Sequence, residues 1–408
     1  MRPAPVLFFV VLAGVLPVSL HAQDAGTRAG QAEQQRREKA KQVEPYSPGR
    51  LERTLLAIEE GYLAERWFNP PRGLFVRAGG MPEGQGLALG PAFRYSTHDA
   101  SLTVTSAVSI RRAWEVTGRL DFPRPKIDPA PLFLSVGGVS HHLPQEDFYG
   151  LGLETTAAGR TSFLLDESSV DVTAGVSPAR WFTLSGTAEY RTERPGPGKD
   201  PKRLSIEALY GDADAPAFQT DLDFVKVGGQ AYINAAPALQ GAPVGGRYLF
   251  SLNRYLDRTA DRYSFNRWDV DLQQYVPLFT PARLIALRAH AAGVVADDGQ
   301  DIPFYLLPTL GGSHSIRGYR VQRFRDRNSL LLQAEYRFGL NDFMSAALFY
   351  DAGKMTFDRE DLWNRDDFRD DYGFSLRFGF MSLAALRAEV VFGGDEGTVF
   401  ALRFGDVF

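Results

Sequence analysis

The stretch Gly311-Gly312-Ser313-His314-Ser315-Ile316-Arg317-Gly318-Tyr319 places one arginine in a glycine-rich loop near the C-terminal end of the sequence. Glu335 follows it, and the run Phe349-Tyr350-Asp351-Ala352-Gly353 comes next. The segments around this loop alternate polar and apolar residues over about ten positions, which is the pattern of strands in a transmembrane β-barrel. An arginine that lies inside such a barrel needs a carboxylate partner.

The alternation assigns the residues of each strand to two faces. In one segment the apolar face consists of Leu332, Ala334, Tyr336 and Phe338. Its other face consists of Gln333, Glu335 and Arg337. A charged face excludes a packed soluble core and indicates a hydrated or plugged lumen.

Sixteen segments of this kind run from Gly73–Gly79 to Thr398–Phe404. Short connections alternate with long ones, as in outer-membrane barrels with short periplasmic turns and long extracellular loops. The sequence therefore predicts an all-β fold, a 16-stranded antiparallel transmembrane β-barrel over residues 73–408. The even number of strands predicts that both barrel ends are periplasmic, in the outer membrane of a Gram-negative-type bacterium.

The residues before the barrel form two further predicted segments. Residues 1–22 have the pattern of a cleaved signal peptide, with Arg2 before an apolar run. Residues 23–69 begin as a polar, charged linker. They continue into a short periplasmic amphipathic helix over Leu51–Trp67. One such helix cannot bury its own apolar face, so we expect it to dock on the barrel or on a partner.

Composition and motifs argue against several other functions. A net charge of −4 does not suggest nucleic-acid binding, and the absence of cysteine excludes disulfides and thiolate chemistry. No Gly-x-Ser-x-Gly motif is present, and nothing pairs the few histidines convincingly, so we expect no enzyme, no catalytic residue and no cofactor. His141-His142 lacks a third ligand at a useful spacing, and no metal site is predicted. The acids of residues 358–371 are interleaved with arginines, which favours a solvated extracellular loop over a Ca²⁺ site.

The loop and the two strands after it resemble the signature of the BamA/TamA-type outer-membrane barrels, also called the bacterial surface antigen family. The motif residues are Gly311, Gly312, Ile316, Arg317, Gly318 and Tyr319, and the matching strand residues are Glu335, Asp351 and Gly353. The resemblance implies that the loop folds into the lumen and that Arg317 pairs with Asp351 and Glu335. Residues 23–69 are too short and too helical for a POTRA module, so the chain resembles the branch that lacks POTRA domains.

The end of the chain resembles the C-terminal β-signal of outer-membrane proteins, carried by Gly397, Phe400, Leu402, Phe404 and Phe408. The family resemblance implies protein insertion into, or translocation across, the outer membrane through a lateral seam between the first and last strands. The implied partners are outer-membrane lipid, client outer-membrane or exported proteins, and a periplasmic or lipoprotein partner. The alternative is a non-enzymatic pore or a structural barrel that serves a partner lipoprotein.

Overall fold

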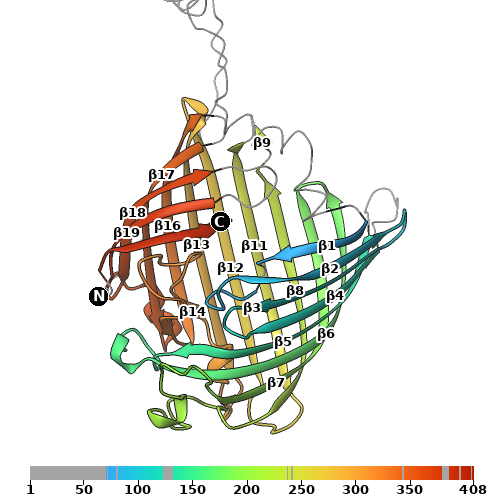
Figure 1. The fold of residues 1–408 in the computed structure, drawn as a ribbon, viewed down its shortest axis with the longest axis vertical. Coiled ribbons are helices and arrows are strands. Elements are labelled where there is room, and N and C mark those ends of the chain that lie inside the picture. Colours follow the sequence, from blue (N-terminus) through green and yellow to red (C-terminus); the bar gives the residue numbers. More distant parts are fainter. Residues whose placement is uncertain are drawn as a thin grey trace, which may run out of the picture. The chain divides into compact units, whose positions relative to one another are not determined.

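The computed structural model describes residues 70, 72–79, 81–122, 132–236, 238–239, 242–341, 344–378, 386–394, 397–405 and 407–408. These residues form an all-β structure in which one antiparallel sheet of sixteen strands dominates (Figure 1). Its strands are β1 (Gly73–Ala78), β2 (Ala88–Ser96), β3 (Ser101–Ser109), β4 (Trp114–Phe122), β5 (Leu132–Phe148), β6 (Thr161–Ala179), β7 (Phe182–Pro197), β8 (Leu222–Ala235), β11 (Gly245–Asp257), β12 (Phe265–Leu278), β13 (Thr280–Ala296), β16 (Asn328–Asn341), β17 (Met344–Thr356), β18 (Arg369–Phe378), β19 (Leu386–Gly393) and β20 (Val399–Phe404).

Four two-residue strands form two small ladders outside the main sheet. The first pairs β9 (Ala238–Leu239) with β10 (Ala242–Pro243), and the second pairs β14 (Thr309–Leu310) with β15 (Phe324–Arg325). The helical elements of the described residues are short 3₁₀ turns, namely η1 (Ala157–Gly159), η2 (Ile206–Ala208), η3 (Phe304–Leu306) and η4 (Arg359–Trp363). Among the described residues, none of these turns has the length and apolar character that a membrane-crossing helix needs.

The strands follow one another in sequence order across the sheet, from β1 at one edge to β20 at the other. The number of strands and their antiparallel arrangement confirm the prediction for this part of the chain. Among the described residues, no pairing joins β1 to β20, so these two strands are the edges of the sheet. The predicted signal peptide, the polar linker and the helix over 51–67 lie outside the described residues.

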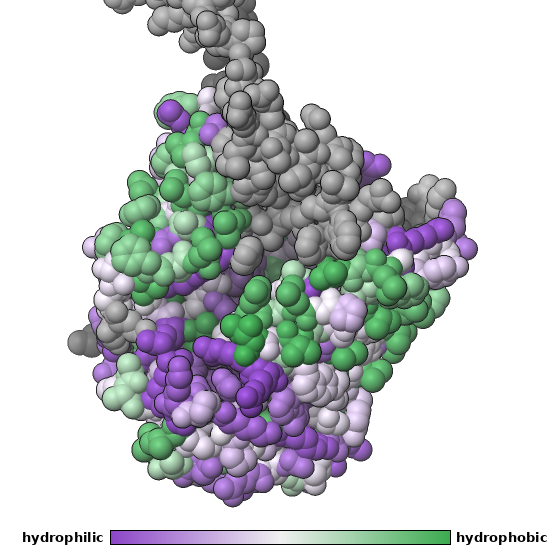
Figure 2. Space-filling model, viewed as in Figure 1, coloured by the Kyte–Doolittle hydropathy of each residue, from purple (hydrophilic) through white to green (hydrophobic). Residues whose placement is uncertain are grey.

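The two faces of the sheet differ as the alternation predicts. Tyr372 and Phe374 on β18 are exposed, whereas Ser375 and Arg377 on the same strand are buried. The face that carries Arg377 is called the inner face below. Figure 2 shows hydrophobic residues gathered over the strands, whereas hydrophilic residues dominate the rim formed by the long loops. Apolar side chains on the outer face suit contact with lipid, and charged side chains on the inner face do not.

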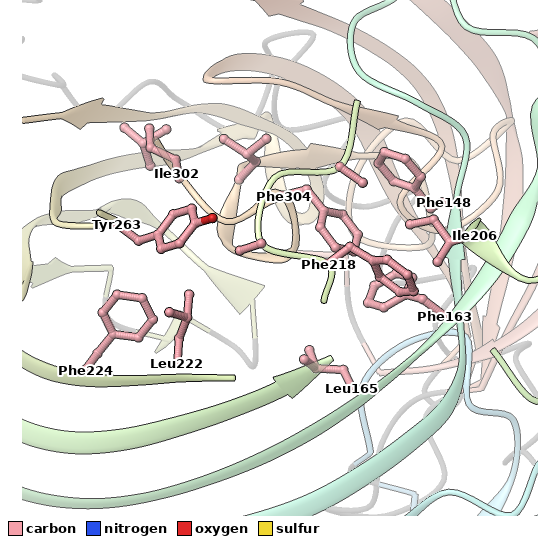
Figure 3. Close-up of a cluster of buried hydrophobic side chains, with 14 of the residues drawn as sticks. Phe148, Phe163, Leu165, Ile206, Phe218, Leu222, Phe224, Tyr263, Ile302 and Phe304 are labelled. Carbon is pink, nitrogen blue, oxygen red and sulfur yellow. The ribbon is translucent and has the colours of Figure 1, made fainter. Parts of the chain in front are cut away.

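At one end of the strands, buried hydrophobic side chains, many of them aromatic, from strand ends and long loops pack into one core (Figure 3). This core is called the cap cluster below. Phe304 of η3 lies at its centre, with ring centroids 4.8 Å from Phe163 and 4.9 Å from Phe148 in edge-to-face geometry. The other labelled members are Leu165, Ile206, Phe218, Leu222, Phe224, Tyr263 and Ile302. Since the cluster joins strand ends to the loops of residues 198–221 and 297–308, it holds these loops together by burial of apolar surface.

The central place of Phe304 leads to a prediction about the cap cluster. Phe304→Ala removes a fully buried ring and should destabilise the folded state by about 3–5 kcal/mol, less where the loops collapse into the space. Urea unfolding, together with protease cleavage of residues 198–221, measures the effect. The matched control is Trp363→Ala, which removes an aromatic ring that is 71% exposed and should change unfolding little. Equal unfolding curves for the Phe304 variant and the wild type would contradict this role.

Candidate functional site

The glycine-rich loop returns to the inner face of the sheet between β14 and β15. The pairing of Leu310 with Phe324 closes its base. Gly311 and Gly312 have φ values of 112° and 105°, a region that favours glycine, and the Gly312 N–H donates to the Tyr319 carbonyl at 3.1 Å. The two glycines therefore let the chain reverse within a few residues.

Apolar side chains seat the loop on the sheet. Ile316 and Tyr319 are buried in a cluster that also contains Leu310, Phe324 and Met355. A Cβ at Gly353 of β17 would lie 2.9 Å from Leu310 Cδ1 and 3.2 Å from Ile316 Cγ2. Gly353 is thus the residue that lets the loop approach the β17 backbone.

Arg317 lies at the tip of the loop and is fully buried among carboxylates. Its Nε and Nη2 donate to the two oxygens of Asp351 at 2.6 and 2.9 Å, a bidentate pair. Its Nη1 donates to Glu335 Oε1 at 2.7 Å and lies 3.5 Å from Glu389 Oε1. The guanidinium carbon is 3.4 Å from the centroid of the Phe349 ring. This set of contacts is called the arginine lock below.

The surrounding carboxylates keep the Arg317 side chain protonated. Burial by itself would lower the pKa of Arg317, but the carboxylates of Asp351, Glu335 and Glu389 outweigh it and raise that pKa above its ordinary value. A buried ion pair of this kind is costly to break, because removal of one partner leaves an unpaired charge out of water. The lock therefore holds the loop tip in one position.

Other arginines complete the lock along the inner face. Glu335 Oε2 accepts from Arg337 at 2.7 Å and from Arg377 at 2.6 Å. Glu389 Oε1 accepts from Arg387 at 3.1 Å. Arg377, Arg387 and Arg403 are direct cross-strand neighbours on β18, β19 and β20. Like charges opposite each other destabilise a sheet, and the contacts of Glu335 and Glu389 with these arginines offset that repulsion.

Asp371 contributes to the site in a way that the sequence did not reveal. The sequence analysis assigned residues 358–371 to a solvated loop, and this is wrong for Asp371, which is fully buried on β18. Its Oδ2 accepts from the Gly318 N–H at 2.8 Å. A Cβ at Gly318 would lie 2.9 Å from Asp371 Cβ, so only glycine allows this approach. Asp371 stands directly opposite Asp351, and this register would have indicated that Asp371 belongs to the site. The register becomes known only when β17 is paired with β18.

A second series of ion pairs crosses the inner face from β1 to β7. Arg77 Nη2 on β1 is 2.7 Å from Glu115 Oε1 on β4. His141 lies between Glu115 and Glu167, with its Nε2 3.1 Å from Glu167 Oε2, and Arg191 Nη2 is 2.7 Å from Glu167 Oε1. Within the described part of the chain, no cluster of three or more His, Cys, Asp or Glu residues could hold a metal. These ion pairs connect β1, β4, β5, β6 and β7 on the inner face and hold the edge strand β1 in place.

The residues expected to form the β-signal separate into two groups. Phe400 and Leu402 are exposed on the outer face of β20. The strand ends at Phe404, and Phe408 lies beyond it, packed against the cluster of Ala236, Tyr275, Leu284 and Ala286. Gly397 precedes β20 with a φ of 77°. Phe408 therefore faces the interior side chains of β12 and β13 and is not part of the outer apolar row.

A sixteen-stranded antiparallel sheet with an apolar outer face, and with an arginine-bearing loop locked to its charged inner face, defines the class of outer-membrane β-barrel proteins. Comparisons with known proteins agree. Residues 243–408 match the Omp85 superfamily domain. The fold is similar to that of BamA from Haemophilus ducreyi lacking POTRA domains 1–3, with a TM-score of 0.58 and 12% identity over 81% of this chain and 69% of that one.

Two curated relatives match at the level of sequence. The chain is 27% identical to the chloroplastic protein TOC75 of Oryza sativa subsp. japonica over 182 residues, and 28% identical to that of Pisum sativum over 187 residues. Each match covers 42% of this chain and 22% of the relative, so the chain spans about a fifth of the length of these relatives. The Omp85 match over residues 243–408 and the BamA-like fold agree with the resemblance of the loop to BamA/TamA-type barrels.

The arginine lock leads to a prediction for Arg317. Arg317→Ala leaves Asp351 and Glu335 without their shared partner and should cost about 3–5 kcal/mol, less if water reaches them. Arg317→Lys keeps the charge but loses the bidentate geometry, so it should fall between alanine and the wild type. Heat-modifiability and urea unfolding of the purified protein measure the loss. Arg365→Ala, at an exposed position of another loop, is the control, and an Arg317→Ala protein as stable as this control would refute the lock.

Asp371 leads to a separate prediction. Asp371→Ala leaves the buried N–H of Gly318 without an acceptor and should cost about 1–3 kcal/mol. Asp371→Asn retains an amide oxygen as acceptor and should keep the loop in place. Limited proteolysis within residues 311–323 reports the position of the loop in each variant. Indistinguishable cleavage of the alanine and asparagine variants would show that this hydrogen bond does not hold the loop.

Proposed function

We propose that the protein inserts proteins into the outer membrane, or translocates them across it, through a lateral seam between β1 and β20. The observation that carries the proposal is the order of the strands: among the described residues, β1 and β20 end the sheet at its two sides. An exposed edge strand presents free N–H and C=O groups to which a client strand can add. On this proposal the sheet closes as a barrel, and the seam is its weakest junction.

The lengths of the edge strands support a seam that opens easily. β1 and β20 have six residues each, whereas β5 and β6 have 17 and 19. A strand needs about 9–11 residues to cross a bilayer, so a junction of β1 with β20 would have few ladder hydrogen bonds. Such a junction would part while the long central pairs stay intact.

The cap cluster supports a gated device rather than an open channel. Phe304, Phe163 and Phe218 pack tightly where the long loops meet, and a packed apolar core admits little water. The alternative is a non-enzymatic pore, which requires an interior that conducts, or a structural barrel that serves a lipoprotein, which requires edges that stay together. We therefore favour insertion or translocation.

The proposed clients are outer-membrane or exported proteins, and the proposed partner is a periplasmic protein or a lipoprotein. The proposed reaction involves no enzyme chemistry and no cofactor.

A reversible lock of the seam tests the proposal. The chain has no native cysteine, so Val76→Cys on β1 and Phe400→Cys on β20 can be joined by a reducible bifunctional cross-linker. Both native side chains are exposed on the outer face. The cross-linked protein, reconstituted in liposomes, should lose its ability to speed the folding of a urea-denatured outer-membrane protein. Reduction of the linker should restore it.

The matched control joins two strands that are already paired. Val116→Cys and Ser140→Cys occupy opposed positions on β4 and β5, and a cross-link there should leave activity unchanged. If the seam-locked protein stays as active as this control, the seam does not open during function. The pore or scaffold alternative would then replace insertion.

A further inference from the structure

The turn between β1 and β2 contains several glycines whose role the arginine lock does not explain. Gly84 and Gly86 have φ values of 97° and 78°, and a Cβ at Gly86 would lie 2.9 Å from Ile110 Cγ1. These glycines let the turn fold back toward the glycine-rich loop. The turn brings two polar side chains there, Glu83, which is exposed, and Gln85, which is 1% exposed.

Glu83 contacts the glycine-rich loop directly. Its Oε1 accepts a hydrogen bond from the backbone N–H of Ser313. Gly312 gives it room, because a Cβ there would lie 2.7 Å from Glu83 Oε2. The positive φ of Gly312 and the absence of its side chain thus both serve this contact. A carboxylate on a backbone N–H is a charge-assisted hydrogen bond, which is stronger than a neutral one.

Gln85 makes a second, buried connection through Glu146 of β5. Its Nε2 donates to Glu146 Oε1, and Gln322 Nε2 donates to Glu146 Oε2 at 2.8 Å. Gln322 belongs to the segment that leads from the loop to β15, and its Oε1 accepts from Arg325 at 2.5 Å. One carboxylate therefore joins the β1–β2 turn to the far side of the loop, away from solvent.

The same loop is bound to the opposite edge of the sheet. Arg403 Nη2 on β20 donates to the Arg317 carbonyl at 3.1 Å. His314 Nδ1 lies 3.1 Å from the carbonyl oxygen of Val407, just beyond β20. Gly394, which follows β19, lies close to Tyr319, since a Cβ there would be 3.1 Å from its ring. Both edges of the sheet thus contact one loop, and in the part of the chain that the structure describes no pairing joins them to each other.

We propose that residues 309–325 form a strap across the seam, and that Glu83 and Gln85 are the positioning residues that hold its β1 side. The arginine lock fixes the strap to β16, β17 and β19, and Arg403 joins it to β20. Glu83 and Gln85 then decide how far β1 can move from β20 while the lock stays closed. The inference rests on the proposed function only in taking the β1–β20 junction as the moving part.

A distance measurement without any client tests the strap. Leu74→Cys on β1 and Phe400→Cys on β20, both 78% exposed in the native chain, carry nitroxide labels on the full-length protein in nanodiscs. Pulsed electron paramagnetic resonance then gives the distribution of distances across the seam. In the added background of Glu83→Ala with Gln85→Ala, the ratio of long to short distances should rise about tenfold, which corresponds to about 1.4 kcal/mol.

Three further measurements separate the strap from a general loss of structure. Labels at Val116→Cys and Ser140→Cys, on paired strands, should keep their distance in the double variant. Glu83→Gln keeps an acceptor oxygen and should widen the seam less than Glu83→Ala. Asp298→Ala, at an exposed acid of the β13–β14 connection, should leave the seam distance unchanged.

Two results would overturn the proposal. The first is a seam distribution in the double variant that superimposes on that of the wild type. The second is an equal widening of the β4–β5 control, which would mean that the variant loosens the whole sheet. Because no client is present, the outcome does not depend on activity. A seam that widens in the variant while the cross-linked seam remains active would retain the strap and reject the proposed function.

Discussion

The burial of one positive charge, that of Arg317, links the glycine-rich loop to the C-terminal strands of this protein. A guanidinium removed from water costs on the order of several kcal/mol unless its hydrogen bonds are replaced. Asp351 and Glu335 replace them, and both acids stand on strands that must pair in one register to present them together. A shift by one residue would turn these acids to the outer face. The lock therefore specifies the register of β16 and β17 as well as the place of the loop.

The same constraint explains the distribution of glycines around the loop. Gly353 and Gly318 stand where a Cβ would collide with the loop or with Asp371, and Gly311 and Gly312 stand where the backbone reverses. Glycine costs stability through the entropy of the unfolded chain. Here it is the only residue that lets a loop backbone lie against a strand backbone closely enough for Arg317 to reach its partners. The lock and the close approach thus depend on each other.

The two edges of the sheet are each bound to a network of charges on the inner face. Arg77 ties β1 to Glu115 of β4, and Arg403 ties β20 to Glu389 and to the loop carbonyl of residue 317. Each edge is therefore tied by charged side chains to the wall on its own side. On the proposed function, this bracing would let β1 and β20 separate while the rest of the sheet keeps its pairing.

The sequence by itself determined the class of fold, the number of strands and their two faces, because alternation with a period of two is a local property. The family resemblance of the glycine-rich loop implied the pairing of Arg317 with Asp351 and Glu335. Only the tertiary structure decided the roles of Asp371, Glu83 and Gln85, and the inward packing of Phe408. These contacts join residues that are far apart in the chain, and they depend on cross-strand register and on how closely a loop approaches the sheet. Neither quantity leaves a periodic pattern in the sequence, so an acid in a charged stretch could not be told from a buried hydrogen-bond acceptor until the strands were paired.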